Sequence, residues 1–246
     1  PGHLQRSLVD AGLLGKKNGR SYFAAEENAL PVTAATDADV ETLRIYGEHP
    51  FFTLLQQRAA LQWPRLRVEQ RPALPGLGPA VQINEAFTVS VTDGRTASQL
   101  AELTAADAFV VDVALNYADT AYLVAAHNRH ASAANKALFL RLLHTAIPQV
   151  EFIKDSPALI VARVLSSLIN ESVIMVESGV CSREDIDVAA VAGVNYADGI
   201  FGWLDNLGEK NVRTTLSNLA QLLHAARYAP HYTLLHAAQP ALTTTP

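Results

Sequence analysis

The sequence is poor in several residue types, and each shortage excludes a class of protein. It holds a single cysteine, Cys181, so neither an internal disulfide nor a multi-cysteine metal site can form. Lysine and arginine total 19 against 24 aspartate and glutamate residues, and no block of like charge is present. A nucleic-acid-binding surface is therefore not expected. The cysteine content indicates a reducing compartment, and we expect a cytoplasmic protein.

Long uninterrupted hydrophobic runs and export signals are also missing. The most apolar stretch, residues 158–176, contains Arg163, Asn170 and Glu171, which predicts a buried helix rather than a membrane span. No signal peptide is visible. The chain begins at Pro1 and has one methionine, so we expect a piece of a longer protein. Hydrophobic residues make up 49% of its 246 residues, enough for a sizeable core.

Residues 41–156 alternate between strand-like and helix-like patterns. Strands are expected at 42–46, 66–70, 80–83, 87–91, 109–115, 121–126 and 150–154, and helices at 50–62, 95–103 and 131–146. This alternation predicts a twisted α/β sheet. The preceding residues 24–40 are small and polar and are interpreted as a linker.

Residues 157–246 have the apolar spacing of helices. Seven apolar positions between Leu159 and Val173 recur at helical intervals. Ser182, followed by Asp185 three residues later, predicts the start of the next helix. A further long helix is expected from about Val212, ending near Arg227.

An ordered set of short motifs runs through the same region. It consists of Asp155-Ser156-Pro157, Arg163, Asn170-Glu171, Glu177-Ser178-Gly179-Val180, Asp185-Ile186-Asp187, Gly193-Val194-Asn195-Tyr196 and Leu204-Asp205-Asn206-Leu207-Gly208. Their order and spacing resemble the C-terminal domain of the 3-hydroxyacyl-CoA dehydrogenases. No single motif is specific, but the ordered set over about 80 residues is. The resemblance implies an all-helical C-terminal domain here.

The beginning of the chain resembles the end of that same domain. Gly12-Leu13-Leu14-Gly15-Lys16-Lys17-Asn18-Gly19, followed by Tyr22-Phe23, matches the family's tail motif. Two copies of one domain are typical of long bacterial enzymes of the phenylacetate-catabolism type. The resemblance therefore divides the chain into the tail of a first copy (1–23), a linker (24–40), a degenerate Rossmann-like α/β domain (41–156) and a second helical copy (157–246).

The degenerate domain lacks the features that bind a dinucleotide. A Rossmann turn needs a second glycine so that the backbone can approach the pyrophosphate. In the corresponding stretch, residues 43–51, Gly47 is the only glycine, and His49 and Phe51 occupy the rest of the turn. The resemblance implies NAD as cofactor of the whole enzyme, but we expect none to be bound by this chain and assign no cofactor-binding residue.

Catalysis is expected to depend on residues outside this chain. The resemblance places the NAD site and a His–Glu pair in an N-terminal domain that is absent here. It also places an asparagine just before Arg163, where this chain has Ala162, which has no amide. The whole enzyme would oxidise the 3-hydroxyl of an acyl-CoA to a ketone. We assign no catalytic residue, and expect this chain to shape the substrate cleft and be inactive alone.

Other polar residues are weaker candidates for function. Lys16 and Lys17, with Arg20, could meet the phosphates of CoA by charge, although a solvated turn is the preferred interpretation. His127 and His130 could be a metal pair or a base, but no cysteine or carboxylate cluster accompanies them, and we expect loop residues and no metal site.

Cys181 precedes a helix start, which lowers a thiol pKa, yet we expect a small packed residue. Arg163 lies on an apolar helix and needs a partner if buried. Glu171, two turns away, could share its face, and we favour a structural ion pair with a neighbouring segment.

The apolar helix also suggests how the chain associates. Its apolar residues surround most of the circumference between Ala158 and Val176, so more than one side needs cover. We expect a homo-oligomer, most simply a two-fold dimer. Two alternatives are a non-catalytic assembly module and an unrelated NAD(P)-dependent enzyme of the 6-phosphogluconate dehydrogenase type. The Gly-Lys-Lys-x-Gly tail followed by a second domain argues against the latter.

Overall fold

The computed structural model describes residues 38–73 and 76–236 of the chain. The expected first-copy tail at 1–23 lies outside the described residues, as do nearly all of the linker and the candidates Lys16, Lys17 and Arg20. Within the described part, no helix is both long enough and apolar enough to cross a membrane.

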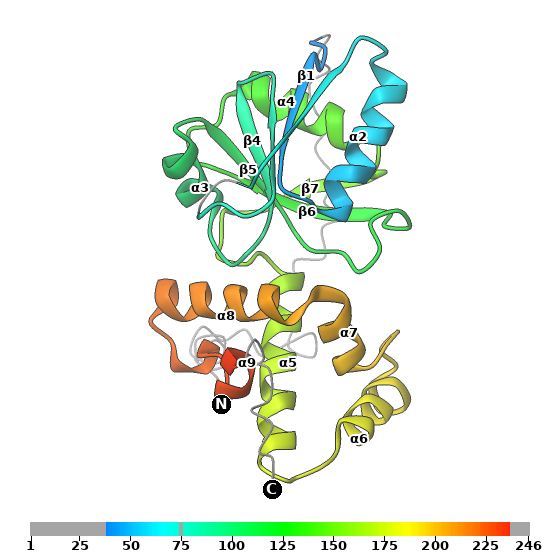
Figure 1. Ribbon diagram of the computed structural model, residues 1–246, viewed down its shortest axis with the longest axis vertical. Coiled ribbons are helices and arrows are strands. Elements are labelled where there is room, and N and C mark those ends of the chain that lie inside the picture. Colours follow the sequence, from blue (N-terminus) through cyan, green and yellow to red (C-terminus); the bar gives the residue numbers. More distant parts are fainter. Residues whose placement is uncertain (1–37, 74–75, 237–246) are drawn as a thin grey trace, which may run out of the picture. The chain divides into compact units, whose positions relative to one another are not determined.

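The first region is built on a seven-stranded mixed sheet (Figure 1). Its strands are β1 (Thr42–Tyr46), β2 (Arg67–Arg71), β3 (Ala80–Ile83), β4 (Phe87–Val91), β5 (Asp107–Val111), β6 (Tyr122–His127) and β7 (Gln149–Phe152). They lie in the order β2-β1-β3-β4-β5-β6-β7. The pairs β1/β2, β4/β5 and β6/β7 are parallel, and the other pairs are antiparallel.

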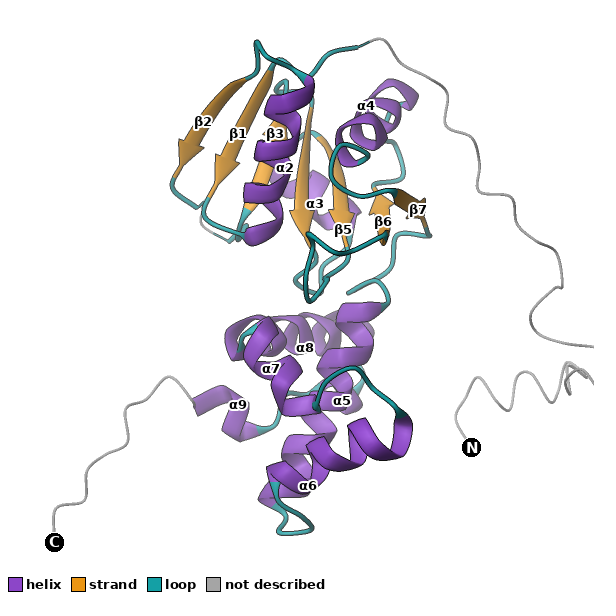
Figure 2. Cartoon of the chain, turned by 90° about the vertical axis from the view of Figure 1, so that its right-hand side faces the viewer, coloured by secondary structure: helices purple, strands orange, loops and turns teal. Residues whose placement is uncertain are grey.

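Each parallel pair is joined by one helix, because parallel neighbours need a crossover connection. The three helices are α2 (Pro50–Gln62), α3 (Ala97–Thr104) and α4 (Ala133–Leu143). Helices α2 and α4 cover one face of the sheet, and α3 covers the other (Figure 2). The sheet is therefore three βαβ units placed side by side, with a β3–β4 hairpin in the middle.

The two faces of the sheet differ in the size of their side chains. The face under α2 and α4 is aromatic, and the Phe109 and Phe139 rings stack with centroids 4.4 Å apart. Across the sheet, the residues under α3 are small, among them Ala80, Ala108 and Ala126. Alternation along β5 produces this division, since Phe109 and Val111 face one side while Ala108 and Val110 face the other.

The second region is helical. Its elements are α5 (Val161–Glu177), α6 (Arg183–Val188), the π-helix η2 (Ala189–Gly193), α7 (Ile200–Leu207), α8 (Glu209–Leu223), the 3-10 helix η3 (Ala226–Tyr228) and α9 (Tyr232–His236). Leu165, Ile169 and Val173 of α5 pack with Phe201 of α7 and Leu216 of α8 in one core. The observed elements are thus a mixed α/β sheet followed by an all-helical region.

Two expected elements end about four residues earlier in the structure than in the sequence analysis. The strand expected at 109–115 stops at Val111, because Asp112 turns away to bind the start of α5. The helix expected to reach Arg227 ends at Leu223, since His224 adopts a left-handed conformation with φ of 46°. Each ending is set by one residue, and the contact or conformation of that residue depends on the surrounding structure.

Candidate functional site

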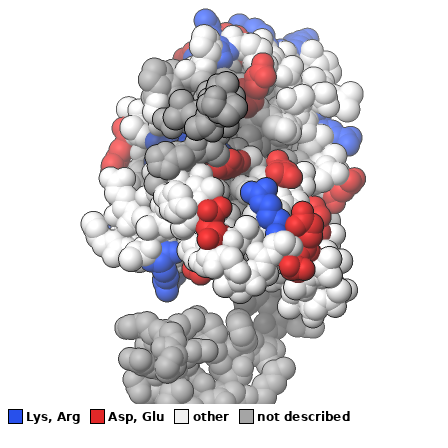
Figure 3. Space-filling view, turned by 60° about the horizontal axis from the view of Figure 1, so that its bottom comes forward, with Lys and Arg blue, Asp and Glu red and all other residues white. Residues whose placement is uncertain are grey.

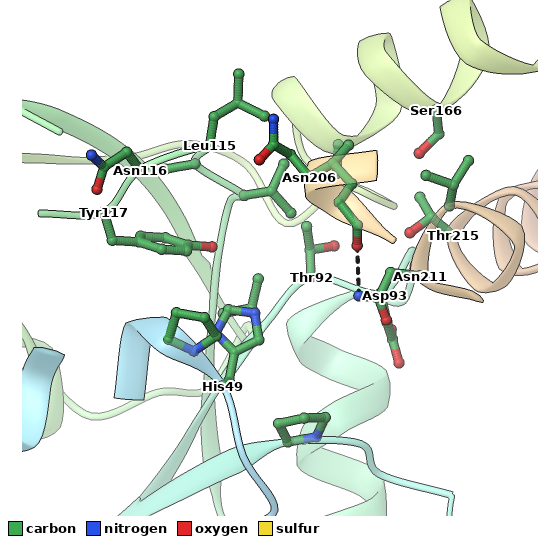
Figure 4. Close-up of a pocket in the computed structure, with 18 of the residues that line it drawn as sticks. His49, Thr92, Asp93, Leu115, Asn116, Tyr117, Ser166, Asn206, Asn211 and Thr215 are labelled. Carbon is green, nitrogen blue, oxygen red and sulfur yellow. Dashed lines mark hydrogen bonds between the residues drawn. The ribbon is translucent and has the colours of Figure 1, made fainter. Parts of the chain in front are cut away.

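A cavity of about 540 Å³ lies at the carboxyl ends of β1, β4 and β5. Its walls come from the loops after these strands and from α5, α7 and α8. Ligand sites in open α/β sheets lie at the carboxyl ends of the strands. Figure 4 shows His49 and Tyr117 on one side of the cavity, with Ser166 and Thr215 on the helices opposite and Thr92 between them. This cavity is the candidate functional site.

His49 is held in place as the N-cap of α2. Its Nδ1 accepts a hydrogen bond from the Phe51 N–H at 3.2 Å, so the ring proton belongs on Nε2. Burial lowers the pKa of His49 to about 4. The imidazole is therefore neutral near pH 7, and its Nε2 can donate a hydrogen bond.

Tyr117 lies beside His49, with the two ring centroids 5.8 Å apart. The phenol is 8% exposed and its hydroxyl is 3.5 Å from the Asp112 carbonyl oxygen, which accepts from it only weakly. Burial raises the pKa of Tyr117 well above its usual range. The phenol is thus a neutral hydrogen-bonding group rather than a base.

Two buried hydroxyls face the cavity from the helical side. Ser166 of α5 is 2% exposed, and Thr215 of α8 is 4% exposed. Ala162 lies one turn before Ser166 on α5 and is also buried in the cavity wall. The helical wall therefore offers hydroxyl groups, but at Ala162 it offers only a methyl group.

The wall is held together by Asp112 at the end of β5. Its buried carboxylate accepts hydrogen bonds from the backbone N–H groups of Ile160, Val161 and Ala162 at 2.7 to 3.0 Å. Helix α5 has no side-chain cap of its own, so this carboxylate takes that role. Burial raises the pKa of the Asp112 carboxyl, and the N–H groups oppose that rise. The bonds connect the sheet directly to the helix that carries Ala162 and Ser166.

A second connection joins the β4–α3 loop to α8. Gly94 has φ of 103°, and a Cβ there would lie 2.7 Å from the Thr215 carbonyl oxygen. Asn218 donates a hydrogen bond to the Asp93 carbonyl oxygen at 2.9 Å. The glycine therefore permits the close approach that brings Thr215 to the cavity.

The charge around this site is mixed. Both signs occur on the face shown in Figure 3, and much of that face is uncharged. At the cavity, Glu48 and Lys210 are exposed, and Asp93 pairs with Arg95 at 2.5 Å. The described residues hold no group of three or more histidine, cysteine or acidic side chains placed to bind a metal.

Comparisons with known protein families match two adjoining parts of the chain. Residues 159–240 match the 3-hydroxyacyl-CoA dehydrogenase C-terminal domain, and residues 89–157 match the 3-hydroxybutyryl-CoA dehydrogenase reduced Rossmann-fold domain. The two matches together span more than half of the sequence. The chain belongs to the 3-hydroxyacyl-CoA dehydrogenase family.

Individual relatives agree with this dehydrogenase assignment. A 3-hydroxyadipyl-CoA dehydrogenase from Escherichia coli K12 is 27% identical over 233 residues, covering 94% of this chain and 42% of that protein. A 3-hydroxybutyryl-CoA dehydrogenase structure from the same species has a TM-score of 0.71 and 24% identity, covering 96% of this chain and 43% of the other.

A third relative is more distant. An (S)-3-hydroxybutyryl-CoA dehydrogenase structure from Ralstonia eutropha has a TM-score of 0.51 and 19% identity, over 60% of this chain and 53% of that one. The two structures show the shared fold. The chain spans less than half the length of the two Escherichia coli proteins.

The dehydrogenase motifs found in the sequence have structural roles. Asn170 is buried, donates to the Ala229 carbonyl oxygen at 3.0 Å and accepts from the His231 N–H at 2.8 Å. The Asp187 carboxylate accepts from the Phe201 N–H at 2.9 Å, at the start of α7. Asn170 and Asp187 therefore connect separate segments of the helical region. Two residues of the last motif, Asn206 and Leu207, line the cavity.

The prediction that Arg163 forms a structural ion pair was wrong. The guanidinium donates to the Pro157 carbonyl oxygen, at 3.1 Å from Nε and 2.5 Å from Nη2, and no ion pair with Glu171 is among the described contacts. The sequence could show that Arg163 needed a partner. It could not show which one, because every residue has a backbone carbonyl and the sequence does not indicate which of them lies nearby.

The remaining candidates lie apart from the cavity. His127 packs edge-on against Phe152 at the end of β6, and its Nδ1 is 2.9 Å from the Asn128 carbonyl oxygen. His130 is exposed in the following turn. Cys181 is a partly exposed free thiol directly before the Ser182 N-cap, which forms the expected capping box with Asp185.

The sequence analysis did not find His49, Tyr117, Ser166 or Thr215 as cavity residues. His49 was noted there only because it stands in place of a glycine. The only available sign of a cavity residue in the sequence was a neutral polar residue within an apolar helix, as at Ser166.

Proposed function

We propose that this chain is the C-terminal portion of an NAD-dependent 3-hydroxyacyl-CoA dehydrogenase and has no activity alone. The whole enzyme would oxidise a 3-hydroxyacyl-CoA to the 3-oxoacyl-CoA in the cytoplasm. The assignment to phenylacetate catabolism rests on the two-copy resemblance alone. In the whole enzyme, this chain would shape the substrate cleft and contribute to oligomerisation.

The composition of the cavity carries this proposal. Ala162 stands where the family has asparagine, so the wall has no amide at that point. A histidine base is normally oriented by a carboxylate, whereas His49 is bonded to the Phe51 N–H. The lowered pKa of His49 also makes it a weak base at neutral pH. These features support a copy that has lost the catalytic set.

The turn after β1 supports the absence of a dinucleotide site. Gly47 is the only glycine in the turn, with φ of 69°. Phe51 follows it and is fully buried in the core under α2. A cofactor pyrophosphate needs free backbone N–H groups at this helix start, and here His49 already bonds one of them.

The alternative role, a non-catalytic assembly module, is favoured by one observation. Ile160, Val161 and Val164 at the start of α5 are 48%, 37% and 51% exposed, although all are apolar. The cluster supports a surface that another helical copy would cover, from a first copy within the same protein or from a second chain.

The experiment that tests the proposal is made in the full-length protein. Ala162→Asn restores the family's amide in this copy. We expect the rate of 3-hydroxybutyryl-CoA oxidation to stay within about twofold of wild type, because the restored amide would have no catalytic His–Glu pair beside it in this copy. A tenfold change in kcat, equivalent to about 1.4 kcal/mol in the barrier, would show that this copy takes part in catalysis.

A further inference from the structure

A second cavity, of about 660 Å³, lies where β1 and β2 begin, at the other end of these strands from the candidate functional site. The two strands are parallel neighbours, so their amino ends lie side by side (Figure 2). The lining comes from the residues just before β1, from the connection between α2 and β2, and from Arg141 of α4. This cavity shares no lining residue with the first one, so it is a separate candidate for binding.

Three arginines line this second cavity, and two of them have no acidic partner. Arg141 pairs with Asp39 at 3.5 Å, and its guanidinium carbon lies 5.5 Å from the centre of the Trp63 ring. Among the contacts of the described residues, neither Arg65 nor Arg67 has an ion pair or a hydrogen bond through its side chain. Two exposed guanidinium groups therefore remain to bind a ligand.

The local backbone brings these two arginines together. Arg67 is the first residue of β2, and Leu66 between the two arginines packs against the core under α2 and α4. Side chains alternate along an extended segment, so residues two apart share a side. Arg65 and Arg67 therefore both point away from the core, and their guanidinium groups can reach the same ligand.

The back of the cavity is fixed by contacts within the fold. The Trp63 indole is 6% exposed, and its Nε1 donates to Asp39 Oδ1 at 3.1 Å. Arg141 also donates to the Ala38 carbonyl oxygen. The charge of Asp39 is thus compensated by Arg141, and neither residue has to move when a ligand enters.

The remaining charges decide which ligand fits. Arg65 and Arg67 carry two positive charges, whereas Glu41 is an exposed carboxylate on the same lining. Helix α2 ends at the cavity, and its last carbonyl groups carry about half a negative charge. A small positive excess is left. Hydrogen bonding then adds to it, because the guanidinium fork matches the oxygens of a phosphate and binds them in pairs.

We propose that Arg65 and Arg67 bind the phosphate group of a small phosphate ester in this cavity. Both guanidinium groups donate to the phosphate oxygens, and Arg141 contributes positive charge behind them. The volume lies within the usual range of ligand pockets, roughly 300 to 1,000 Å³, so the body of the ester has space beside the phosphate. The site needs no dehydrogenase activity in this chain, and it goes beyond the proposed function.

The test is a titration of this chain with glycerol 3-phosphate, inorganic phosphate and acetate, followed by the backbone amide resonances in a low-salt buffer without phosphate. We expect saturable shifts at residues 39–41 and 63–67 with glycerol 3-phosphate. Inorganic phosphate should bind no more tightly than the ester, and acetate about tenfold more weakly or worse, because it has one charge and two oxygens.

Each of the other outcomes overturns a part of the proposal. Acetate that binds as tightly as the ester overturns the preference for phosphate. Inorganic phosphate that binds more tightly than the ester overturns the choice of an ester. Absence of saturable shifts, or shifts confined to other residues, overturns the site. None of these results affects the dehydrogenase assignment, which is tested by turnover of the full-length protein.

Variants locate the binding at the two arginines. Arg65→Gln and Arg67→Gln should each weaken binding of glycerol 3-phosphate about threefold to tenfold. Arg58→Gln is the matched control, because Arg58 is an exposed arginine of α2 that does not line the cavity, and we expect less than a twofold change. Unchanged affinity in both cavity variants, or an equal loss in the control, contradicts the proposal.

A variant of opposite sign tests the charge balance. Glu41→Gln removes the exposed carboxylate from the lining, so it should tighten binding of glycerol 3-phosphate about twofold to threefold at low salt. Added sodium chloride should reduce that gain, because the charges are exposed. Weaker binding in Glu41→Gln than in wild type would show that this carboxylate takes part in holding the ligand and that the cavity does not select an anion.

Discussion

At the scale of single residues, two glycines of the helical region differ in their surroundings. A Cβ at Gly199 would lie 2.3 to 2.6 Å from side-chain atoms of Asp187, whose carboxylate holds the start of α7. A Cβ at Gly193 would meet nothing within 4 Å. Of these two glycines, only Gly199 has a steric reason to be glycine.

We expect Gly199→Ala to lower the free energy of unfolding by about 1 to 3 kcal/mol, in the range typical of overpacking. The matched change Gly193→Ala should alter it by less than about 0.5 kcal/mol, as is usual for surface substitutions. Urea denaturation followed by circular dichroism measures both. Equal stability of the two variants would show that Asp187 can move aside freely.

The residue scale also shows the limits of reading the sequence. The family motifs include Asn170 and Asp187, but the contacts that these two residues make appear only in the fold. Asn170 binds backbone groups about 60 residues away, at Ala229 and His231. Contacts to a distant backbone depend on the chain's path, which side-chain identity does not encode.

At the scale of elements, the capping of α5 is the decisive contact. Asp112 joins the end of β5 to the first N–H groups of α5 and is 1% exposed. An asparagine there would turn an NH₂ group toward N–H donors and remove a negative charge from the helix start. Unsatisfied buried donors are costly to the folded state.

We therefore expect Asp112→Asn to lower the free energy of unfolding by about 2 to 3 kcal/mol. Asp205→Asn is the matched control, because Asp205 is exposed on α7. Chemical denaturation of the two variants beside wild type gives the comparison. A loss below about 0.5 kcal/mol for Asp112→Asn would mean that the helix start finds other acceptors, and the capping account would be wrong.

Most elements could be predicted from the sequence because their patterns are local. Helix α2 spans Pro50–Gln62 and β1 spans Thr42–Tyr46, both as expected from apolar spacing and the proline at the helix start. The end of β5 could not be predicted, since the apolar run continues to Leu115 and only the tertiary role of Asp112 stops it. The mixed strand order also depends on pairings between distant segments.

At the scale of the whole molecule, the exposed start of α5 bears on association. Val164 is 51% exposed, whereas Leu168 on the same helix is partly buried against the helical core. A charged side chain at Leu168 would therefore disturb the helical core. A charged side chain at Val164 would mainly affect a contact made at the surface, so Val164→Glu is the variant used to test association.

We expect this chain to form a dimer in sedimentation velocity and Val164→Glu to be monomeric. The control is Leu103→Glu on α3, an equally apolar side chain that is 59% exposed elsewhere. A wild-type chain that stays monomeric at high concentration would rule out this contact. A dimer that persists in Val164→Glu would place the interface on another surface.

The candidate site was only partly predictable from the sequence. The absence of an amide at Ala162 and of a second glycine near Gly47 could be read directly from the sequence. The cavity could not, because His49, Ser166 and Thr215 come from three distant segments brought together by the Asp112 and Gly94 contacts.

The central claim is that this chain carries a dehydrogenase copy without a working cofactor site. The most direct test is calorimetric titration of the purified chain with NADH. We expect no saturable heat of binding, because the turn after β1 lacks the second glycine and His49 already bonds the Phe51 N–H. Saturable binding with a micromolar Kd would contradict the claim and show that the degenerate domain still holds its cofactor.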